Sequence, residues 1–320
     1  MPRNARSISP RRVLPSPKLS LPHLYPLRSR IMASQAPIPT RPIKVLMLHG
    51  FTQSGTLFHA KTRALEKNLQ KAFPAGITLH YPTAPIRLSL ADVPFVASNE
   101  DPASYGVDKD KDKELDVWGW WRRKGDSEPY TYEGIERGMD HIAEVLKTEG
   151  PFDGVIGFSQ GGACAGMLAS LLEPGRREAF ESFYPDGGMR YPESFEDSTG
   201  YITTAIHPPL KFAVSYSGFA ARGGKLYRGF YEPKIKTPIL HFLGTLDTVV
   251  EEKRSLALVE ACERSEGRVV YHPGGHFLPS SQKAYVSALI SFIREVTADV
   301  DGTKKESADE SHQVLPTGIQ

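Results

Sequence analysis

The stretch that decides the fold is Val155-Ile156-Gly157-Phe158-Ser159-Gln160-Gly161-Gly162. Residues 152–156, which end in the apolar pair Val155-Ile156, read as a buried strand, and 163–172 is typical of a buried helix. Between them, residues 157–161 fit the pattern G-x-S-x-G. A serine between a strand and a helix, with glycines on either side, predicts a sharp turn that exposes its hydroxyl. The motif alone occurs often by chance, so the strand before it and the helix after it carry the argument.

The same alternation of strand and helix extends outward in both directions. The pattern predicts further strands at 45–48, 77–81, 211–217, 238–244 and 269–272, and further helices at 61–73, 132–148, 251–265 and 280–296. Strands and helices that alternate through short links indicate a mostly parallel, doubly wound sheet with helices on both faces. We therefore expect one α/β domain over residues 42–297.

Two segments of this domain show no such pattern. Residues 86–131 and 173–209 read as irregular, and both are candidate lid segments over a pocket. The mixed-charge run at 108–114 is most simply a solvated loop. The polar, acidic residues 298–320 have the composition of a disordered tail.

The first 41 residues differ in composition from the rest. They are rich in Arg, Ser and Pro and contain no acid. This composition fits either a disordered extension, with translation starting at Met32, or a mitochondrial targeting leader in residues 1–31. The prolines disfavour the amphipathic helix that a leader needs. We therefore expect a cytoplasmic protein, with a nuclear location also compatible and mitochondrial targeting as the alternative.

The net charge of +2 is an average over unlike parts. Residues 1–44 hold nine Lys or Arg and no acid, so the remaining residues hold 30 basic and 37 acidic side chains. An acidic body gives no support for nucleic-acid binding. No apolar run approaches the roughly 18 residues that span a bilayer, so we expect no membrane span.

The sequence contains no pattern that indicates a disulfide framework, a metal site or a cofactor site. Cys164 and Cys262 are the only cysteines, and Cys164 reads as a small buried apolar residue. No metal motif, P-loop or dinucleotide fingerprint is present, so no metal and no cofactor are expected.

A serine nucleophile needs a base, an acid that orients the base, and donors for the oxyanion. Asp247 follows the strand at 238–244, and His276 follows the strand at 269–272 in a glycine-rich loop. The order Ser159, Asp247, His276 is the chain order of α/β-hydrolases. His272 is the main competitor as base, since His80 and His241 read as strand-edge residues. Asp247 also fits an ordinary loop residue or the N-cap of the helix at 251, but Gly244 and the following Val249-Val250 favour the catalytic role.

The expected oxyanion donors are backbone N–H groups. One belongs to Gln160, the residue after the nucleophile, and the other to Phe51 in the loop after the first strand. His49, in the same loop, is expected to shape the loop rather than to move protons.

Several segments together resemble one family. They are Leu48-His49-Gly50-Phe51 with Gln53, Tyr81-Pro82-Thr83-Ala84-Pro85, the Trp118–Trp121 cluster, Gly150-Pro151-Phe152-Asp153-Gly154, residues 157–161, Ser215-Tyr216-Ser217-Gly218, residues 243–247 and His272-Pro273-Gly274-Gly275-His276. The chain resembles the fungal FSH family of serine hydrolases, whose human relative is the ovarian cancer-associated gene 2 protein. The resemblance implies an α/β-hydrolase that cleaves small-molecule esters or thioesters with the triad Ser159, Asp247 and His276.

The resemblance leaves the substrate open. Some members of the family release polyketides from synthases, so an acyl carrier protein or a polyketide synthase is a conceivable partner. An acyl-protein thioesterase is an alternative function within the same enzyme class. A non-catalytic binding module with the α/β-hydrolase fold is the alternative from a different class. Candidate residues of an acyl pocket are the aromatics Phe51, Phe158, Trp118, Trp120, Trp121 and Phe277, although the tryptophans fit a core equally well. We expect a preference for apolar acyl chains over acetyl, and the oligomeric state stays open.

Overall fold

The computed structural model describes residues 39–89, 92, 116–125, 127–199, 202–221 and 224–298. A six-stranded sheet lies at its centre, and every neighbouring pair of strands is parallel. In spatial order the strands are β12 (Val269–His272), β11 (Ile239–Gly244), β10 (Phe212–Tyr216), β7 (Gly154–Phe158), β1 (Ile43–Leu48) and β2 (Ile77–His80). The sheet predicted from the sequence is therefore present.

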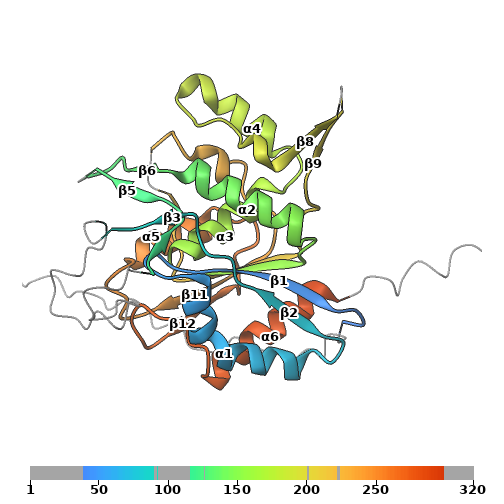
Figure 1. The fold of residues 1–320 in the computed structure, drawn as a ribbon. Helices are drawn as coiled ribbons and strands as arrows, with labels where there is room; N and C mark the ends of the chain where they lie inside the picture. The colour runs from blue at the N-terminus through green and yellow to red at the C-terminus, as the bar shows by residue number, and fades with distance from the viewer. Residues whose placement is uncertain are drawn as a thin grey trace, which may run out of the picture. The chain divides into compact units, whose positions relative to one another are not determined.

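Helices cover both faces of the sheet (Figure 1). They are α1 (Gly55–Ala72), α2 (Ile135–Glu149), α3 (Gln160–Leu171), α4 (Arg176–Phe183), α5 (Glu252–Glu260) and α6 (Lys283–Thr297). Helices α1 and α6 pack on one face, whereas α2 and α3 pack on the other. None of the helices in the described ranges is long and apolar enough to cross a membrane.

Strand β1 shows why the sheet has two cores. Leu46 and Leu48 belong to the core beneath α2 and α3, whereas Val45 and Met47 belong to the core beneath α1 and α6. Successive side chains of a strand point to opposite faces, so a strand buried on both faces must be apolar throughout. Each fully buried side chain of this size contributes about 1.5–3 kcal/mol to folding.

Helix α1 begins six residues earlier than the predicted residue 61. Its N-cap is Ser54, whose hydroxyl accepts a hydrogen bond from the N–H of Leu57. The missed signal is this cap, because serine favours the position before the first helical residue. Helix α2 begins later than predicted, since residues 131–133 form a strand instead.

The two segments expected to be irregular contain regular structure. In the first, β3 (Ile86–Arg87) pairs with β4 (Trp118–Gly119), and β5 (Arg122–Lys124) pairs with β6 (Thr131–Glu133). The second contains α4 and the hairpin of β8 (Glu196–Thr199) and β9 (Ile202–Ala205), with 3₁₀ turns at Tyr184–Asp186 and Glu193–Phe195. Whether either segment acts as a lid stays a prediction. The mixed-charge run at 108–114, residues 1–38 and the tail from 299 lie outside the described residues.

Buried charges anchor α4 to the rest of the domain. The side chains of Glu173 and Arg176 form an ion pair of 2.7 Å and are 6% and 2% exposed. Glu173 also accepts hydrogen bonds from the backbone N–H groups of Lys236 and Thr237. Arg176 donates to the carbonyl oxygens of Gly229 and Pro233. All of these charges are therefore satisfied inside the protein, as buried charges must be.

Candidate active site

Three loops at the carboxyl ends of parallel strands bring the predicted triad together. Ser159 follows β7, Asp247 follows β11, and His276 follows β12. The Nε2 atom of His276 lies 2.9 Å from Oγ of Ser159, and its Nδ1 atom lies 2.8 Å from Oδ2 of Asp247. Residues separated by up to 117 positions thus form one chain of hydrogen bonds.

The turn at Ser159 explains the glycines of the motif. Ser159 has φ 54° and ψ −116°, and its N–H donates to the carbonyl oxygen of Tyr216 at 2.8 Å. A Cβ atom on Gly157 would lie 1.9 Å from the carbonyl oxygen of Gly161. One on Gly161 would lie 2.0 Å from the carbonyl oxygen of Leu48. Strand, turn and helix approach so closely that only glycine fits at these two positions.

Asp247 is held as a carboxylate. Its Oδ1 atom accepts the N–H groups of Val249 and Val250 at 3.0 and 2.9 Å, which leaves Oδ2 for His276. Burial opposes ionisation, but the hydrogen bond and charge of His276 and the N–H of Val250 outweigh it. The pKa of Asp247 is therefore lowered below its usual value.

The two residues expected to supply the oxyanion donors line the same cavity as Ser159. Gln160 is the first residue of α3, and the first N–H groups of a helix have no acceptor inside the helix. Within the described ranges, no hydrogen bond uses the N–H of Phe51.

The tryptophan cluster braces the loops that carry these donors. The side-chain amide of Gln160 accepts the N–H of Trp120 at 2.8 Å and donates to the carbonyl oxygen of Trp121 at 2.9 Å. The indole N–H of Trp120 donates to the carbonyl oxygen of His49 at 3.0 Å. The N–H of Thr52 donates to the carbonyl oxygen of Trp118 at 2.9 Å. These contacts hold the loop that contains Phe51 and the turn that contains Gln160. No local pattern in the sequence predicts them.

His49 is buried and neutral. Burial lowers its pKa to about 4, against the opposing effects of the Gly50 carbonyl and Asp116. Its Nε2 atom accepts the N–H of Ala84 at 2.9 Å, and Nδ1 lies 2.7 Å from the carbonyl oxygen of Gly50. Accepting at Nε2 assigns the proton to Nδ1. These contacts hold the loop after β1.

The other histidines lie outside the triad. His272 is 1% exposed and packs on the rings of Phe277 and Tyr285, and its ring nitrogens have no hydrogen-bond partner among the described residues. His80 ends β2, which is an edge strand. The prediction that His241 lies at a strand edge is wrong. It is buried in β11, an interior strand, with Nε2 3.7 Å from Sγ of Cys262.

A cavity of about 960 Å³ opens at Ser159 and His276. It lies near the upper end of the usual size range for ligand sites. Of the expected aromatics, the lining includes Phe51, Phe158, Trp121 and Phe277. It further includes apolar or aromatic residues that the sequence did not single out, namely Phe58, Tyr132, Phe219, Val249, Val250 and Leu278.

The expectation that Trp118 and Trp120 line the pocket is wrong. Trp120 is fully buried in the core against α2 and α3. The indole N–H of Trp118 donates to Asp116 at 2.7 Å, and the guanidinium of Arg87 lies 5.6 Å from its ring centre. These partners hold both indoles outside the cavity lining.

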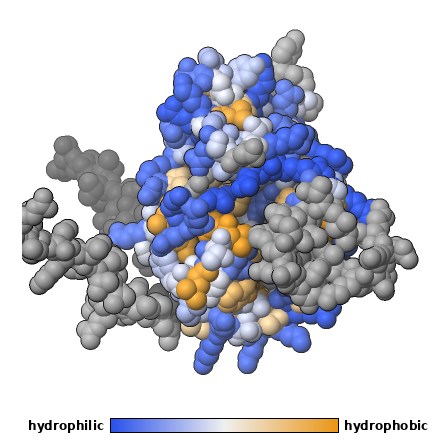
Figure 2. All heavy atoms as spheres, turned by 90° about the vertical axis from the view of Figure 1, so that its left-hand side faces the viewer, coloured by the Kyte–Doolittle hydropathy of each residue, from blue (hydrophilic) through white to orange (hydrophobic). Residues whose placement is uncertain are grey.

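Apolar side chains are exposed in two of the loops that carry the triad residues. Figure 2 views the side on which the strands end, with hydrophobic surface gathered near its centre and hydrophilic surface around it. Leu246, Val249 and Phe277, in the loops after β11 and β12, are 68%, 40% and 39% exposed. An apolar substrate would therefore meet compatible surface at the entrance.

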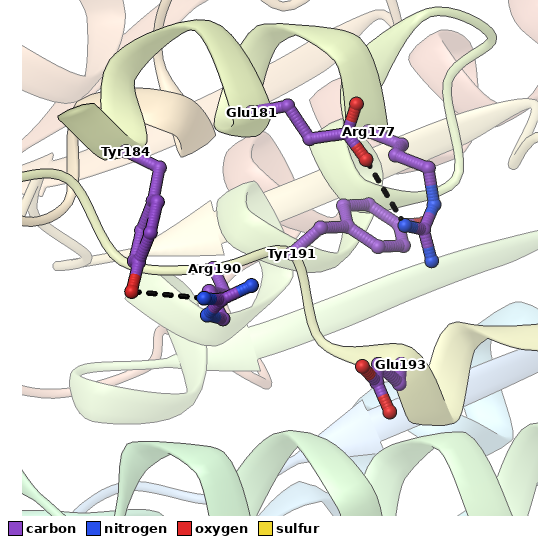
Figure 3. Close-up of a pocket in the computed structure, with 6 residues that line it drawn as sticks. All are labelled: Arg177, Glu181, Tyr184, Arg190, Tyr191 and Glu193. Carbon is purple, nitrogen blue, oxygen red and sulfur yellow. Dashed lines mark hydrogen bonds and ion pairs between the residues drawn. The ribbon is translucent and has the colours of Figure 1, made fainter.

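A second, smaller cavity of about 270 Å³ lies at α4 and contains no member of the triad (Figure 3). It is lined by Arg177, Glu181, Tyr184, Arg190, Tyr191 and Glu193. Its polar groups bond to one another, with Arg177 donating to Glu181 at 3.1 Å and Arg190 to the Tyr184 hydroxyl at 3.0 Å.

Both cysteines are buried free thiols, and burial raises the pKa of each. The described parts of the chain contain no cluster of three or more His, Cys, Asp or Glu that could hold a metal ion.

Comparison with known proteins now decides the family. The model of the serine hydrolase family FSH1 matches residues 39–288. The chain belongs to this family of serine hydrolases. Family of serine hydrolases 3 of Saccharomyces cerevisiae is 33% identical over 256 residues, which cover 80% of this chain and 85% of that protein. The human esterase OVCA2 is 28% identical, with 79% of this chain and 97% of that protein covered. The resemblance seen in the sequence is thus confirmed.

Two further similarities support less, the first because this chain matches only part of the relative and the second because the sequence identity is low. A protein of Schizosaccharomyces pombe named dihydrofolate reductase is 34% identical over 79% of this chain, but the chain spans only 47% of that protein's length. The crystal structure of Zea mays acyl-protein thioesterase 2 matches with a TM-score of 0.50 at 19% identity, covering 82% of this chain and 96% of that one. This structural likeness concerns the fold alone, and the predicted α/β-hydrolase fold is confirmed.

Proposed function

We propose that this member of the FSH1 family hydrolyses carboxylic esters or thioesters of apolar acids, with Ser159 as nucleophile. The observation that carries the proposal is the continuous path from Ser159 Oγ through His276 to Asp247, with contacts of 2.9 and 2.8 Å. The family and its esterase-named relatives support ester hydrolysis. The apolar part of the 960 Å³ cavity supports an apolar acyl group.

The reaction follows from this arrangement. Nε2 of His276 takes the proton of Ser159 as Oγ attacks the acyl carbonyl. The N–H groups of Phe51 and Gln160 stabilise the negative charge on the carbonyl oxygen. His276 then passes the proton to the departing alcohol or thiol, which leaves an acyl-enzyme. A water molecule, deprotonated by His276, hydrolyses that ester and restores the serine.

Asp247 supports each proton transfer. With Oδ2 facing Nδ1 of His276, it fixes the tautomer in which Nε2 can accept a proton, and it stabilises the imidazolium that forms. The strained backbone of Ser159 fixes the hydroxyl in place before substrate arrives.

A series of p-nitrophenyl esters tests the acyl preference. We expect kcat/KM to rise from acetate to octanoate, because each methylene of the acyl chain that is buried in the cavity stabilises the bound substrate by up to about 0.8 kcal/mol. The Ser159→Ala variant is the control for uncatalysed hydrolysis. A steady fall from acetate to decanoate would refute the preference for apolar chains.

A further inference from the structure

Trp120 and Trp121 lie between the end of β4 and the start of β5, and both side chains are buried. Within the described residues, neither is paired in a strand ladder, so their backbone groups need other partners. The side chain of Gln160, itself buried, supplies two of them. Its Oε1 atom accepts the N–H of Trp120 at 2.8 Å, and its Nε2 atom donates to the carbonyl oxygen of Trp121 at 2.9 Å. The carboxamide therefore joins the first residue of α3 to this segment at two points.

The same segment holds the loop of the other expected donor on both sides of Phe51. The indole N–H of Trp120 donates to the carbonyl oxygen of His49 at 3.0 Å, and the carbonyl oxygen of Trp118 accepts the N–H of Thr52 at 2.9 Å. Thr52 has φ 69°, a conformation that β-branched residues rarely adopt. Strain of this kind persists only where the neighbouring structure holds it, and here it directly follows the donor residue.

Aromatic stacking keeps residues 118–121 in place. The ring centre of Trp121 lies 5.2 Å from that of Tyr132, and Tyr132 stacks on Tyr227 at 4.9 Å. The hydroxyl of Tyr227 also accepts the N–H of Tyr132 at 2.6 Å. Side chains packed in a protein interior have little room to shift. Residues 118–121 are therefore a firm connection between the two donor loops.

We propose that the carboxamide of Gln160 is a positioning group for the oxyanion: acting through residues 118–121, it sets the separation between the N–H groups of Phe51 and Gln160. This inference rests on the proposed ester or thioester hydrolysis and extends it to a side chain outside the triad. A donor stabilises the oxyanion only within about 2.7–3.1 Å of the oxygen. A small change in the separation therefore weakens stabilisation of the transition state more than it weakens substrate binding.

A trifluoromethyl ketone with an octyl chain measures oxyanion stabilisation directly. Oγ of Ser159 adds to the carbonyl carbon, the serine proton passes to His276, and the carbonyl electron pair becomes a negatively charged oxygen facing the two donors; no group leaves. The pKa of this hemiketal oxygen follows from fluorine NMR spectra recorded over a range of pH. Stronger donors lower that pKa, whereas a change in the amount of folded protein alters only the intensity of the signal.

Gln160→Met removes both hydrogen-bonding groups of the side chain and keeps its length. Loss of a whole oxyanion donor costs about 10²–10³ in kcat, and displacement of a donor costs part of that. We therefore expect the pKa of the hemiketal to rise by about one pH unit and kcat on p-nitrophenyl octanoate to fall by about tenfold. KM and the affinity for octanamide should change by less than about threefold, because the lost interaction acts in the transition state.

Trp120→Phe tests the proposal from the other loop, so the result does not depend on whether Gln160→Met folds. Phenylalanine lacks the indole N–H that holds His49 but keeps the backbone N–H that Gln160 accepts. We expect the pKa of the hemiketal to shift in the same direction.

Tyr191→Phe is the matched control. The hydroxyl of Tyr191 donates to the carbonyl oxygen of Leu171, the last residue of α3, at 2.8 Å in a buried position. The substitution removes a buried hydrogen bond between a side chain and the backbone at the other end of the same helix. It should lower stability without moving the pKa of the hemiketal.

The outcomes separate this proposal from the proposed function. If wild-type protein neither hydrolyses p-nitrophenyl octanoate nor forms the hemiketal, the proposed function fails. If wild-type protein forms the hemiketal and folded Gln160→Met keeps the same pKa, the positioning role alone is refuted. Where Gln160→Met does not fold, an unchanged pKa in Trp120→Phe refutes it, and so does an equal shift in Tyr191→Phe.

Discussion

At Ser159 the backbone has φ 54°, and residues other than glycine rarely adopt a positive φ. Such strain costs on the order of 1–3 kcal/mol, and the surrounding structure must stabilise it. The hydrogen bond from Ser159 N–H to Tyr216 and the closely packed Gly157 and Gly161 do so. The result is a hydroxyl aimed at His276 before any substrate binds.

Replacing Asp247 by Asn tests the role of the acid. Because Oδ1 is fixed by two backbone N–H groups, the amide nitrogen of Asn would face Nδ1 of His276. The histidine would then carry its proton on Nε2, where it cannot accept the proton of Ser159. We expect kcat on p-nitrophenyl octanoate to fall by about 10⁴. A loss of less than tenfold in folded protein would contradict this role.

The residues of the candidate triad were predictable because each carries a local signal. Ser159 stands in a glycine motif after a strand, and Asp247 and His276 each follow a strand in loops. Pocket residues carry no such signal. Trp118 reads as a pocket aromatic, but Asp116 and Arg87 hold it elsewhere, and those contacts arise only in the folded chain.

At the scale of elements, the strands of the central sheet were predictable, whereas helix α4 and the paired strands outside that sheet were not. Strand β1 contains the continuous apolar run Val45–Leu48, which suffices to identify it. Strands β3 and β4 have two residues each and pair across about thirty positions of sequence, so neither has a periodic pattern. The bracing of the oxyanion loops has the same character, because Gln160 contacts Trp120 and Trp121 from a distant element.

The buried pair of Glu173 and Arg176 should determine how firmly α4 is attached. In Glu173→Ala, the guanidinium of Arg176 stays buried without its partner, and three donors from Lys236 and Thr237 lose their acceptor. We expect the free energy of unfolding to fall by about 3–5 kcal/mol in urea titrations.

The matched control for this substitution is Glu181→Ala. Glu181 pairs with Arg177 on the same helix, but its side chain is 60% exposed. Exposed pairs contribute little, so the change should stay within about 1 kcal/mol. Equal losses in the two variants would show that burial of the Glu173 pair has no special effect.

At the scale of the whole molecule, one sheet separates two cores and places the triad loops at one edge. Because two histidines are buried in the neutral form, the free energy of unfolding should depend on pH. Burial lowers the pKa of His241 to about 3 and that of His49 to about 4, whereas the usual value is 6.5. The unfolded chain therefore binds more protons than the folded one between these values, and stability should decline as pH falls from 6.5 toward 4.

His241→Gln isolates one of these groups. Near pH 5, the unfolded chain takes up nearly one proton at His241 and the folded chain almost none. The slope of unfolding free energy against pH should therefore be smaller in the variant by about 1.4 kcal/mol per pH unit. Urea titrations between pH 4.5 and 6 measure both slopes, and identical slopes would mean that His241 is protonated in the folded protein.

The central claim is that Ser159 is an activated nucleophile within a working triad. Mass spectrometry of protein treated with a fluorophosphonate probe tests it most directly. We predict one adduct per wild-type molecule, on the peptide that contains Ser159, and no adduct on that peptide in Ser159→Ala. A correctly folded wild-type protein that stays unlabelled, or equal labelling of the two proteins, would contradict the claim.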